Sequence, residues 1–543
     1  METSTVLLQS AVAAPLLAGI LVVLAKSAPL AARKTLAFFG FAVPFVLALA
    51  LCWTFADACD PETGYAFVSD VSWLGIPSLG FWLKFGLNGV SLPLFVMAAI
   101  VGFAAGLRAL WTKDVRHPTL YYAMLLLIEL GVLGLFASVD VFSFYIFHEF
   151  ALIPTFIAIL MWGGYGKRGA AMMMAVYLTV GGMIALGGLL WLYTSLPAVG
   201  FNFIDIKQAL IDNPGVLAEQ SQNIIAGILI LGFGILVSLF PFHSWAPDTY
   251  TSAPTPVSMF HAGVLKKFGL YGLVQIGIVC LPLGMAHWAN WLVALAICNI
   301  VVIGLITLAQ KNLKHMVSYS SVNHMGPIFL GIAAYSLSSG DMTGVAAAVI
   351  MMFAHGLSVA LLFHLTESVA QRTGTLEMAK IGGLAKQAPV LAAFFVAAAM
   401  ASVGLPGFAN FWGELSIFVS LVSLKPFWLI SLVLITIVIS AIYSLRAVAR
   451  VFFGPAVEGG VPAAVRNQIT DITLRERVPA FILFAALLAV GFVPSLITDP
   501  VNAALCAPKF VAEIEIVPEE NPVPADAEPV LAPDPETRVI KVQ

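Results

Sequence analysis

Long apolar stretches, separated by short polar ones, follow one another along nearly the whole chain. Each stretch has about twenty residues, which at 1.5 Å per residue is enough for a helix to cross the hydrocarbon core of a bilayer. We count about fourteen stretches, with centres near residues 15, 45, 98, 128, 150, 182, 232, 268, 298, 326, 355, 400, 438 and 487. The alternating pattern of a membrane β-barrel is absent. The sequence therefore predicts an all-α polytopic membrane protein.

The composition supports this class. The 543 residues are 60% hydrophobic and only 10% charged, whereas soluble domains average about 25% charged residues. The apolar run 6–24 lacks a basic segment before it, so we interpret it as a span and not as a cleaved signal. Five cysteines show no metal-site spacing; Cys52 and Cys59 could pair near one membrane face, but all five are best interpreted as small residues.

Basic residues gather in alternate loops. One set of loops carries Lys26, Arg33, Lys34, Arg108, Lys113, Arg116, Lys167, Arg168, Lys311, Lys314, Arg372, Lys380, Lys386, Arg446, Arg450, Arg466, Arg475 and Arg477. The opposite loops, at 57–70, 205–219 and 341, are acidic or nearly neutral. Because basic loops stay in the cytoplasm, this alternation predicts that both termini lie outside.

Two apolar segments are interrupted by proline and glycine. They are LFPFHSWAPD at 239–248 and GLPGFANFWGE at 404–414. Paired interruptions are typical of transporter repeats with discontinuous helices. We therefore expect discontinuous helices near residues 241 and 406, five spans apart, within two inverted five-helix repeats.

These observations divide the chain into five parts. They are helices 1–3 in residues 1–118, a first repeat of helices 4–8 in 119–281, a second repeat of helices 9–13 in 288–455, a last transmembrane helix in 478–498 and a tail in 508–543. The tail is acidic and rich in proline, a composition that cannot bury a core, so it should be disordered.

Ionisable residues inside the spans are the main candidates for chemistry. Residues 119–162 contain Glu129, Asp140 and Glu149 but no lysine or arginine. A carboxylate in hydrocarbon costs at least about 2.5 kcal/mol, so it is rare without a function. Glu129 and Glu149 can bind and release protons as neighbouring charges change. The alternative is a structural ion pair or a carboxyl group that faces the lipid headgroups.

Lys266 and Lys267 lie in a second such stretch, MFHAGVLKKFGLYGLV at 259–274. Adjacent helical residues point about 100° apart, so only one of them easily faces a given interior path. A buried lysine can serve as a proton carrier, and the other lysine can snorkel toward water.

Further candidates lie in the second half of the chain and near the first break. Histidines in or beside apolar segments are His243, His261, His324 and His355. Each can be a proton relay or a hydrogen-bonded core residue. Glu414 follows the second break, where freed backbone groups need water or protein partners, so it is either a proton-transfer group or a structural cap. Lys314 by itself fits a lysine at the membrane interface.

Four stretches together resemble the antiporter-like membrane subunits of proton-pumping NADH:quinone oxidoreductase, complex I. They are FYIFHEFALIP at 144–154, PFHSWAPDTYTSAP leading into AGVLKKFGLYG at 241–272, NLKHMVSYSSVNHMG at 312–326, and GLPGFANFWGE. The resemblance covers about residues 85–455. The chain looks most like subunit M, the bacterial counterpart of mitochondrial chain 4, because of HEFALIP and because a glutamate stands at position 414.

The resemblance implies a role for each candidate residue. Glu149 corresponds to the fifth-helix glutamate that modulates a lysine, Lys267 to the central lysine, and Glu414 to the outlet group. The remaining matches are Glu129 on the fourth helix, His324 and His355 as connecting groups at the centre, and Lys314 near the cytoplasmic surface.

One departure from the family pattern is serious. The family has a lysine on the seventh helix before PFH, where this chain has Leu236. Lys266 stands where the family usually has leucine. We therefore form the hypothesis that Lys266 swings toward the seventh helix and takes over part of the missing lysine's work.

The resemblance implies a proton-translocating subunit of a respiratory NADH:quinone oxidoreductase, a translocase in a bacterial cytoplasmic (inner) membrane. The chain itself would bind no cofactor or metal, and electron transfer to quinone would occur in partner subunits. Expected partners are other membrane subunits, such as L- and N-like neighbours, the peripheral redox arm and lipid, but no nucleic acid. Alternatives are a subunit of a multisubunit cation/proton antiporter, a subunit of a hydrogenase-linked complex, and a relative that is structural and does not pump.

Overall fold

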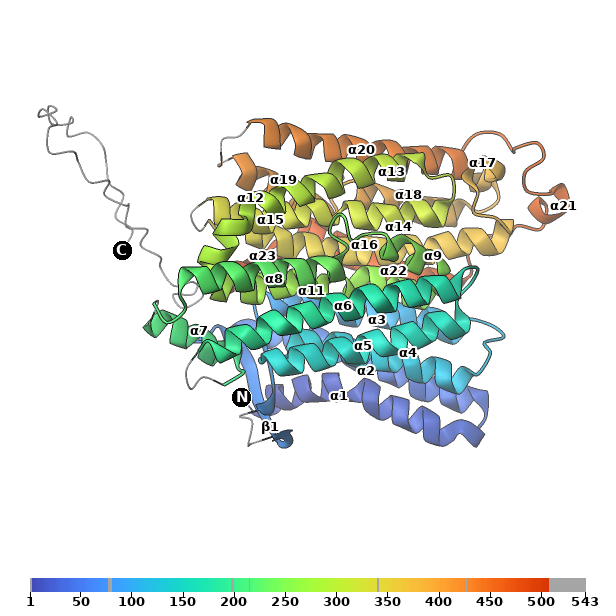
Figure 1. Cartoon of the computed structure of the whole chain (residues 1–543). Coiled ribbons are helices and arrows are strands. Elements are labelled where there is room, and N and C mark those ends of the chain that lie inside the picture. Colours follow the sequence, from blue (N-terminus) through green and yellow to red (C-terminus); the bar gives the residue numbers. More distant parts are fainter. Residues whose placement is uncertain are drawn as a thin grey trace, which may run out of the picture.

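The computed structural model is a bundle of helices that run side by side (Figure 1). It describes residues 2–76, 81–196, 200–213, 215–338, 341–422, 424 and 427–506. The predicted disordered tail at 508–543 lies outside the described residues. The prediction of an all-α polytopic fold is confirmed.

The first part of the chain forms three helices and a β-hairpin. Its elements are α1 (Glu2–Leu24), the 3₁₀ turn η1 (Ala25–Ser27), α2 (Leu30–Ala58), the antiparallel strands β1 (Tyr65–Ile76) and β2 (Phe81–Asn88), and α3 (Ser91–Trp111). The start of this hairpin lies in the stretch 57–70 that the hydropathy pattern predicts as a loop. The hairpin is tied to the bundle because Gln275 bonds both Tyr65 and Asn88.

The next part contains the first interrupted helix. Its elements are α4 (Pro118–Ala137), α5 (Val141–Trp162), α6 (Lys167–Thr194), α7 (Phe203–Asp212), α8 (Glu219–Val237), α9 (Trp245–Ser252), α10 (Thr255–Phe260), the π-helix η3 (His261–Leu265), α11 (Lys267–Gly272) and the π-helix η4 (Leu273–Ile278). Asp140 caps α5 by accepting a 2.6 Å hydrogen bond from the Ser143 backbone N–H, which starts a new helix directly after α4.

The remaining elements complete the bundle. They are α12 (Pro282–Cys298), the π-helix η5 (Asn299–Ile303), α13 (Gly304–Ala309), α14 (Leu313–Asn323), α15 (Met325–Leu337), α16 (Thr343–Thr373), α17 (Met378–Ile381), η6 (Leu384–Lys386), α18 (Pro389–Ser402), α19 (Ala409–Val422), α20 (Phe427–Phe452), α21 (Ala463–Arg466), α22 (Leu474–Phe492) and α23 (Ser495–Cys506). Among the described cysteines, Cys52 and Cys59 are free thiols.

Each of the predicted span centres falls within a helix. Within the described residues, ten helices are long and apolar enough to cross a membrane, and the bent pair of α22 and α23 raises the number to at most eleven. The other predicted spans, near residues 268, 326 and 400, are segments broken into shorter helices. The sequence count was higher because hydropathy alone does not register such breaks.

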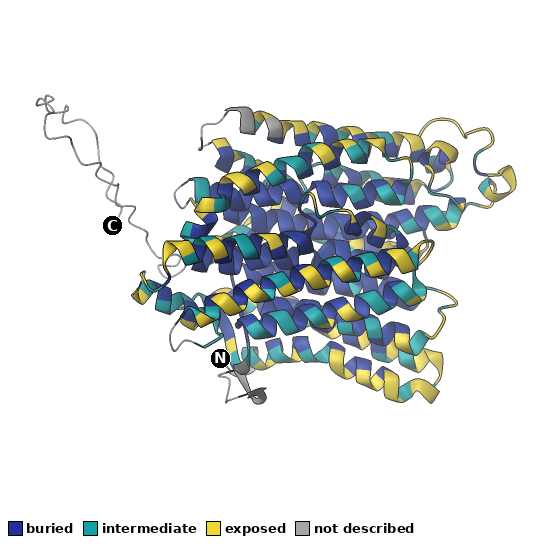
Figure 2. Cartoon of the chain, viewed as in Figure 1, coloured by how far each residue is buried: buried dark blue, intermediate teal, exposed yellow. Residues whose placement is uncertain are grey.

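The centre of the bundle is α16. Its most apolar window is completely buried, whereas only 39% of the corresponding windows of α1 and α6 is buried. Figure 2 shows this gradient, with buried residues in the middle and exposed ones on outer helices. Helix α16 packs against α3, α10, α15, α18, α19 and α22. A polar side chain on α16 is therefore shielded from lipid by a full ring of helices.

Both predicted interruptions are present. Helix α8 ends at Val237 and α9 begins at Trp245, while α18 ends at Ser402 and α19 begins at Ala409. Asn299 in η5 provides hydrogen-bond partners for the backbone groups freed at the first break. Its side-chain oxygen accepts from Phe240 N at 2.6 Å, and its side-chain nitrogen donates to Ser238 O and Val322 O at 3.2 Å each. A single side chain thus joins the broken α8–α9 segment to the end of α14, as buried backbone groups require.

The two ends of the bundle carry different loops. Helix α7 and strand β1 lie at one end with the N-terminus, and α17 and α21 lie at the other (Figure 1). The first end holds the acidic loops, and the second holds basic residues such as Lys380 and Arg466. The predicted separation of loop charges is therefore a property of the fold.

Candidate functional site

Lys267 lies at the centre of the molecule and is fully buried. The π-helical turn η3 precedes it, and Lys266 N bonds His261 O instead of following the α-helical pattern. The Lys267 ammonium donates to Ala262 O at 2.6 Å and contacts His355 Nδ1 of α16 at 2.9 Å. The π-turn therefore supplies a backbone carbonyl for a lysine that has no carboxylate partner among its described hydrogen bonds.

Two histidines extend this contact toward the second half. The ring centroids of His355 and His324 are 5.6 Å apart. His324 stands at the junction of α14 and α15, and its Nδ1 is 2.8 Å from Ser320 O. The Nε2 atoms of both histidines lack hydrogen-bond partners among the described residues. An unpaired buried polar atom costs about 1–3 kcal/mol, which favours a role beyond packing.

Tyr443 of α20 leads from these histidines toward Glu414 of α19. Ser320 Oγ and the Tyr443 hydroxyl are 2.9 Å apart, and both residues are buried. Glu414 is half-buried and acts electrostatically on Tyr443. A Cβ at Gly404 would lie only 2.1 Å from Glu414 Oε2, so this glycine leaves the space that the carboxylate occupies beside the second break. We call Lys267, His355, His324, Tyr443 and Glu414 the central track.

Lys266 is buried, but its side chain points away from the central track. Its ammonium donates to Ser321 O at 3.1 Å and Ser321 Oγ at 3.2 Å, and lies 5.1 Å from the ring centroid of Tyr250. Ser321 belongs to α14 and Tyr250 to α9. The expected swing of the Lys266 side chain toward Leu236 of α8 is not observed. The Ser321 carbonyl and the Tyr250 ring stabilise its ammonium group instead.

Glu149 and its neighbour His148 lie on the other side of the lysines. Glu149 Oε1 is 3.4 Å from His148 Nδ1, and the two side chains are 31% and 8% exposed. His148 and Leu236 line one small cavity together with Phe268, the residue after Lys267. Among the described residues, no hydrogen bond or ion pair joins Glu149 directly to Lys267.

Glu129 is isolated from both lysines. It is completely buried, and neither carboxylate oxygen has a hydrogen-bond partner among the described residues. A Cβ at Gly102 would lie 1.8 Å from Glu129 Oε2, so α3 has a glycine where the carboxyl group of α4 packs against it. The structure therefore gives Glu129 a tight site but no polar neighbour.

Lys314 begins α14 and is half-buried. Its ammonium donates to Ala253 O at 3.0 Å, just after α9. Glu367 of α16 is close by, where it accepts from Thr255 Oγ1 at 3.1 Å and lies 4.0 Å from Arg108. Lys314 is thus part of a charged cluster near the helix ends and not of the buried track.

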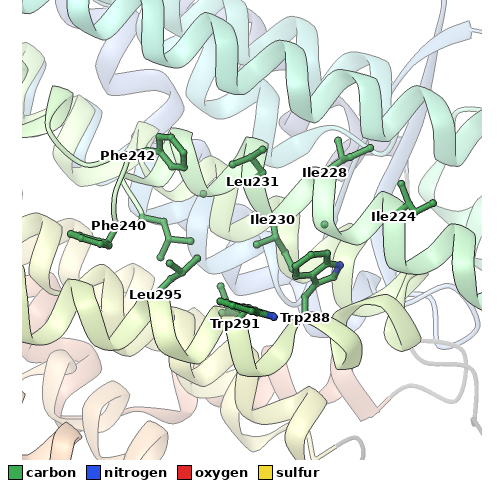
Figure 3. A pocket seen from close by; sticks show the side chains of 13 residues that line it. Ile224, Ile228, Ile230, Leu231, Phe240, Phe242, Trp288, Trp291 and Leu295 are labelled. Atoms are coloured by element: carbon green, nitrogen blue, oxygen red, sulfur yellow. The ribbon is translucent and has the colours of Figure 1, made fainter.

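One cavity is apolar and lies apart from these groups. Its volume is about 480 Å³, and it lies between α8 and α12, as Figure 3 shows. Trp288, Trp291, Leu231 and Phe240 contribute to its wall. Its lining contains none of the ionisable candidates, so it offers a surface for apolar groups and not a route for charge.

Sequence reasoning missed four polar residues that the structure brings to the site: His148, Asn299, Ser320 and Tyr443. Each reaches its partners across long sequence separations or within an otherwise apolar helix. His148 was detectable as an ionisable neighbour of Glu149, whereas no local signal marks Tyr443. Among the described residues, no group of histidine, cysteine, aspartate or glutamate could hold a metal ion.

The chain is similar to several known proteins. An NAD(P)H-quinone oxidoreductase chain 4 protein of Picosynechococcus sp. is 32% identical over 505 residues, which covers 87% of this chain and 88% of the relative. A chain 4 protein of Synechococcus elongatus is 33% identical over 471 residues, with coverages of 85% and 84%. The resemblance to subunit M and chain 4 is therefore confirmed.

Solved structures agree with these relatives. A chain of respiratory complex I from Thermus thermophilus with bound NADH superposes with a TM-score of 0.78 and 27% identity, covering 92% of this chain and 99% of that one. A chain of the Mrp complex from Dietzia sp. shares the fold at 19% identity, a TM-score of 0.78 and coverages of 93% and 97%. The family model for NADH:quinone oxidoreductase/Mrp antiporter transmembrane proteins matches residues 138–440, and the chain belongs to this family.

Proposed function

We propose that this chain is a proton-translocating membrane subunit of an NADH:quinone oxidoreductase. The observation that carries the proposal is the contact of Lys267 with His355 and of His355 with His324 in the buried centre of the bundle. Buried ionisable groups in sequence are what a proton relay in a membrane needs. The relatives named NAD(P)H-quinone oxidoreductase chain 4 support the assignment to this enzyme. Redox chemistry takes place in partner subunits, and this chain holds no cofactor.

The residues have distinct roles in this proposal. Glu149 senses charge at the edge of the chain, Lys267 holds the central proton, and Glu414 is the outlet. His324 and His355 connect Lys267 to Glu414. Lys266, Glu129 and Lys314 contribute at the sides: Lys266 near α9 and α14, Glu129 between α3 and α4, and Lys314 near the cytoplasmic surface.

The decisive test is Lys267→Ala in the assembled complex. Pumping should fall by about a hundredfold or more, because general acid–base groups typically contribute at least that factor. The measurement is NADH-driven proton uptake in liposomes, normalised to NADH oxidation and to the amount of assembled complex. Lys386→Ala, at an exposed lysine, is the matched control and should pump normally. Full pumping by Lys267→Ala would refute the proposal, and sodium-dependent transport without a redox partner would favour the cation/proton antiporter.

The proposal includes a bacterial cytoplasmic membrane, with the basic loops in the cytoplasm and both termini outside. It also includes neighbours that resemble subunits L and N. In a variant without Cys52 and Cys59, a cysteine at Gly64 should react with an impermeant thiol reagent from outside, and a cysteine at Lys113 should not. The opposite labelling pattern would reverse the orientation.

A further inference from the structure

The residue beside Glu149 is ionisable and faces the interior. His148 is 8% exposed, whereas Glu149 is 31% exposed, so the imidazole lies on the core side of the carboxylate. Their nearest atoms, Nδ1 and Oε1, are 3.4 Å apart, which is within ion-pair range but outside hydrogen-bond alignment. A small rotation of either side chain would let a proton pass between them.

Gly182 of the neighbouring helix α6 lies beside the same groups. A Cβ at Gly182 would lie 3.6 Å from His148 Cε1, 3.7 Å from the Tyr145 hydroxyl and 3.8 Å from Glu149 Oε1, which are ordinary van der Waals distances. Three polar groups of α5 thus converge on one position of α6.

His148 also occupies the region that the missing seventh-helix lysine would enter. His148 and Leu236 line a cavity of about 10 Å³, which is close to the size of one water molecule. Phe268, directly after Lys267, lines the same cavity, and its ring centroid is 6.0 Å from that of His148. A lysine stem at position 236 would therefore extend toward His148 and Glu149.

We infer that His148 is the proton-carrying group of the first half of the chain and performs the work of the lysine that Leu236 replaces. The inference rests on the proposed function. In the step, the N–H bond at His148 Nδ1 breaks and an O–H bond forms at Glu149 Oε1, so imidazolium and carboxylate become neutral imidazole and carboxylic acid. In the reverse step, the proton returns from Glu149 Oε1 to His148 Nδ1 and restores the ion pair when the charge near Glu149 changes.

His261 supplies the next group toward the lysines. It is buried, its Nδ1 has no hydrogen-bond partner among the described residues, and both His148 and Lys266 act on it electrostatically. Its ring centroid is 5.4 Å from that of Tyr250, the ring that Lys266 also approaches. His261 therefore interacts electrostatically with both His148 and Lys266 and shares the Tyr250 ring with Lys266.

Titratable groups of the described residues lie near His148. Tyr145 and Glu149 from its own helix contact it, and His261 from η3 interacts with it electrostatically. Helices α6, α8 and α11 present Gly182, Ala185, Leu189, Phe233, Leu236 and Phe268.

The test compares three variants in the complete complex, reconstituted in liposomes. His148→Gln should lower pumping by about tenfold or more and change its pH dependence, because it removes an ionisable group. Adding Leu236→Lys to His148→Gln should restore most of the rate. His364→Gln is the control, because His364 is a buried histidine of α16 that bonds the backbone of Glu476 away from this cluster.

The outcomes separate this inference from the proposed function. Normal pumping with an unchanged pH profile in His148→Gln, while Lys267→Ala is inactive, overturns the inference alone. Equal pumping by Lys267→Ala and the wild type overturns the proposed function. If His148→Gln does not assemble, His148→Lys keeps an ionisable group. It should pump with its pH profile displaced, and an unchanged profile would overturn the inference.

Discussion

The two halves of this chain arrange their ionisable groups differently. Lys267, at the end of the first repeat, contacts His355 of the second half, His355 packs against His324, and Ser320 and Tyr443 continue these contacts toward Glu414. In the first half, Glu149 and His148 lie near Leu236 and Phe268, and no hydrogen bond among the described residues joins them to either lysine. The two halves of one fold need not carry the same relay.

The difference has a structural cause. His355 comes from α16, whose apolar window is completely buried, and Tyr443 comes from α20, whose apolar window is 44% buried. The first-half groups come from α5, whose apolar window is 50% buried. His355 and His324 are buried and the Glu149 side chain is 31% exposed, so the histidines are shielded within the chain and Glu149 lies closer to its outer surface.

After Lys267→Ala, the largest expected effects come from removing the carboxyl group of Glu149 or of Glu414. Glu149→Gln and Glu414→Gln keep the side-chain shape and remove the ionisable group, so each should reduce pumping by about tenfold or more while assembly is retained. Proton uptake per NADH oxidised provides the measurement. If assembled Glu149→Gln complexes pump at the full rate, Glu149 is structural. Proton transfer by ionisable groups would then be expected only in the second half.

Two glycines test how tightly each half is built. Gly404 has φ +79°, and a Cβ there would meet the Glu414 carboxylate, so Gly404→Ala should displace the carboxylate, destabilise the break by about 1–3 kcal/mol and lower pumping severalfold. Gly182→Ala meets its neighbours at 3.6 Å or more and should be nearly normal. Thermal stability of the purified complex and pumping give the readouts, and equal effects of both variants would contradict the difference.

Variants of Lys266 test whether this lysine, the neighbour of Lys267, takes over the work of the seventh-helix lysine that Leu236 replaces. Since its ammonium is bound by Ser321 of α14, Lys266→Leu should reduce pumping by only a few-fold, and Leu236→Lys should not rescue it. The double variant measures this directly. Full rescue would instead support the hypothesis that Lys266 acts toward α8.

The smallest expected effect concerns two tyrosines. Tyr443→Phe removes the hydroxyl that contacts Ser320 and should slow pumping about two- to fivefold, comparable to losing one hydrogen bond of about 0.5–1.5 kcal/mol. Tyr145→Phe, beside Glu149, should change the rate less, because it lies outside the central track. A larger effect at Tyr145 than at Tyr443 would indicate that the rate-limiting proton transfer takes place in the first half.

Much of this molecule follows from the sequence alone. Twenty-residue apolar stretches set the helices, proline and glycine marked both interruptions, and the cost of charge in hydrocarbon pointed to Glu129, Glu149 and the pair of Lys266 and Lys267. Glu414 followed from its place after the second break, and only the resemblance to the family distinguished Lys267 from Lys266. These features are local or depend on composition. The alternation of basic loops likewise needed only the order of the spans.

Only the tertiary structure decided which of these groups meet. The Ser320–Tyr443 contact joins residues 123 positions apart, and the Lys267–His355 contact joins residues 88 apart. The π-turn before Lys267 and the direction of Lys266 depend on carbonyls and rings that other helices supply. Hydropathy fixes that a helix crosses the membrane but not its rotation about its own axis, which is set by packing against its neighbours.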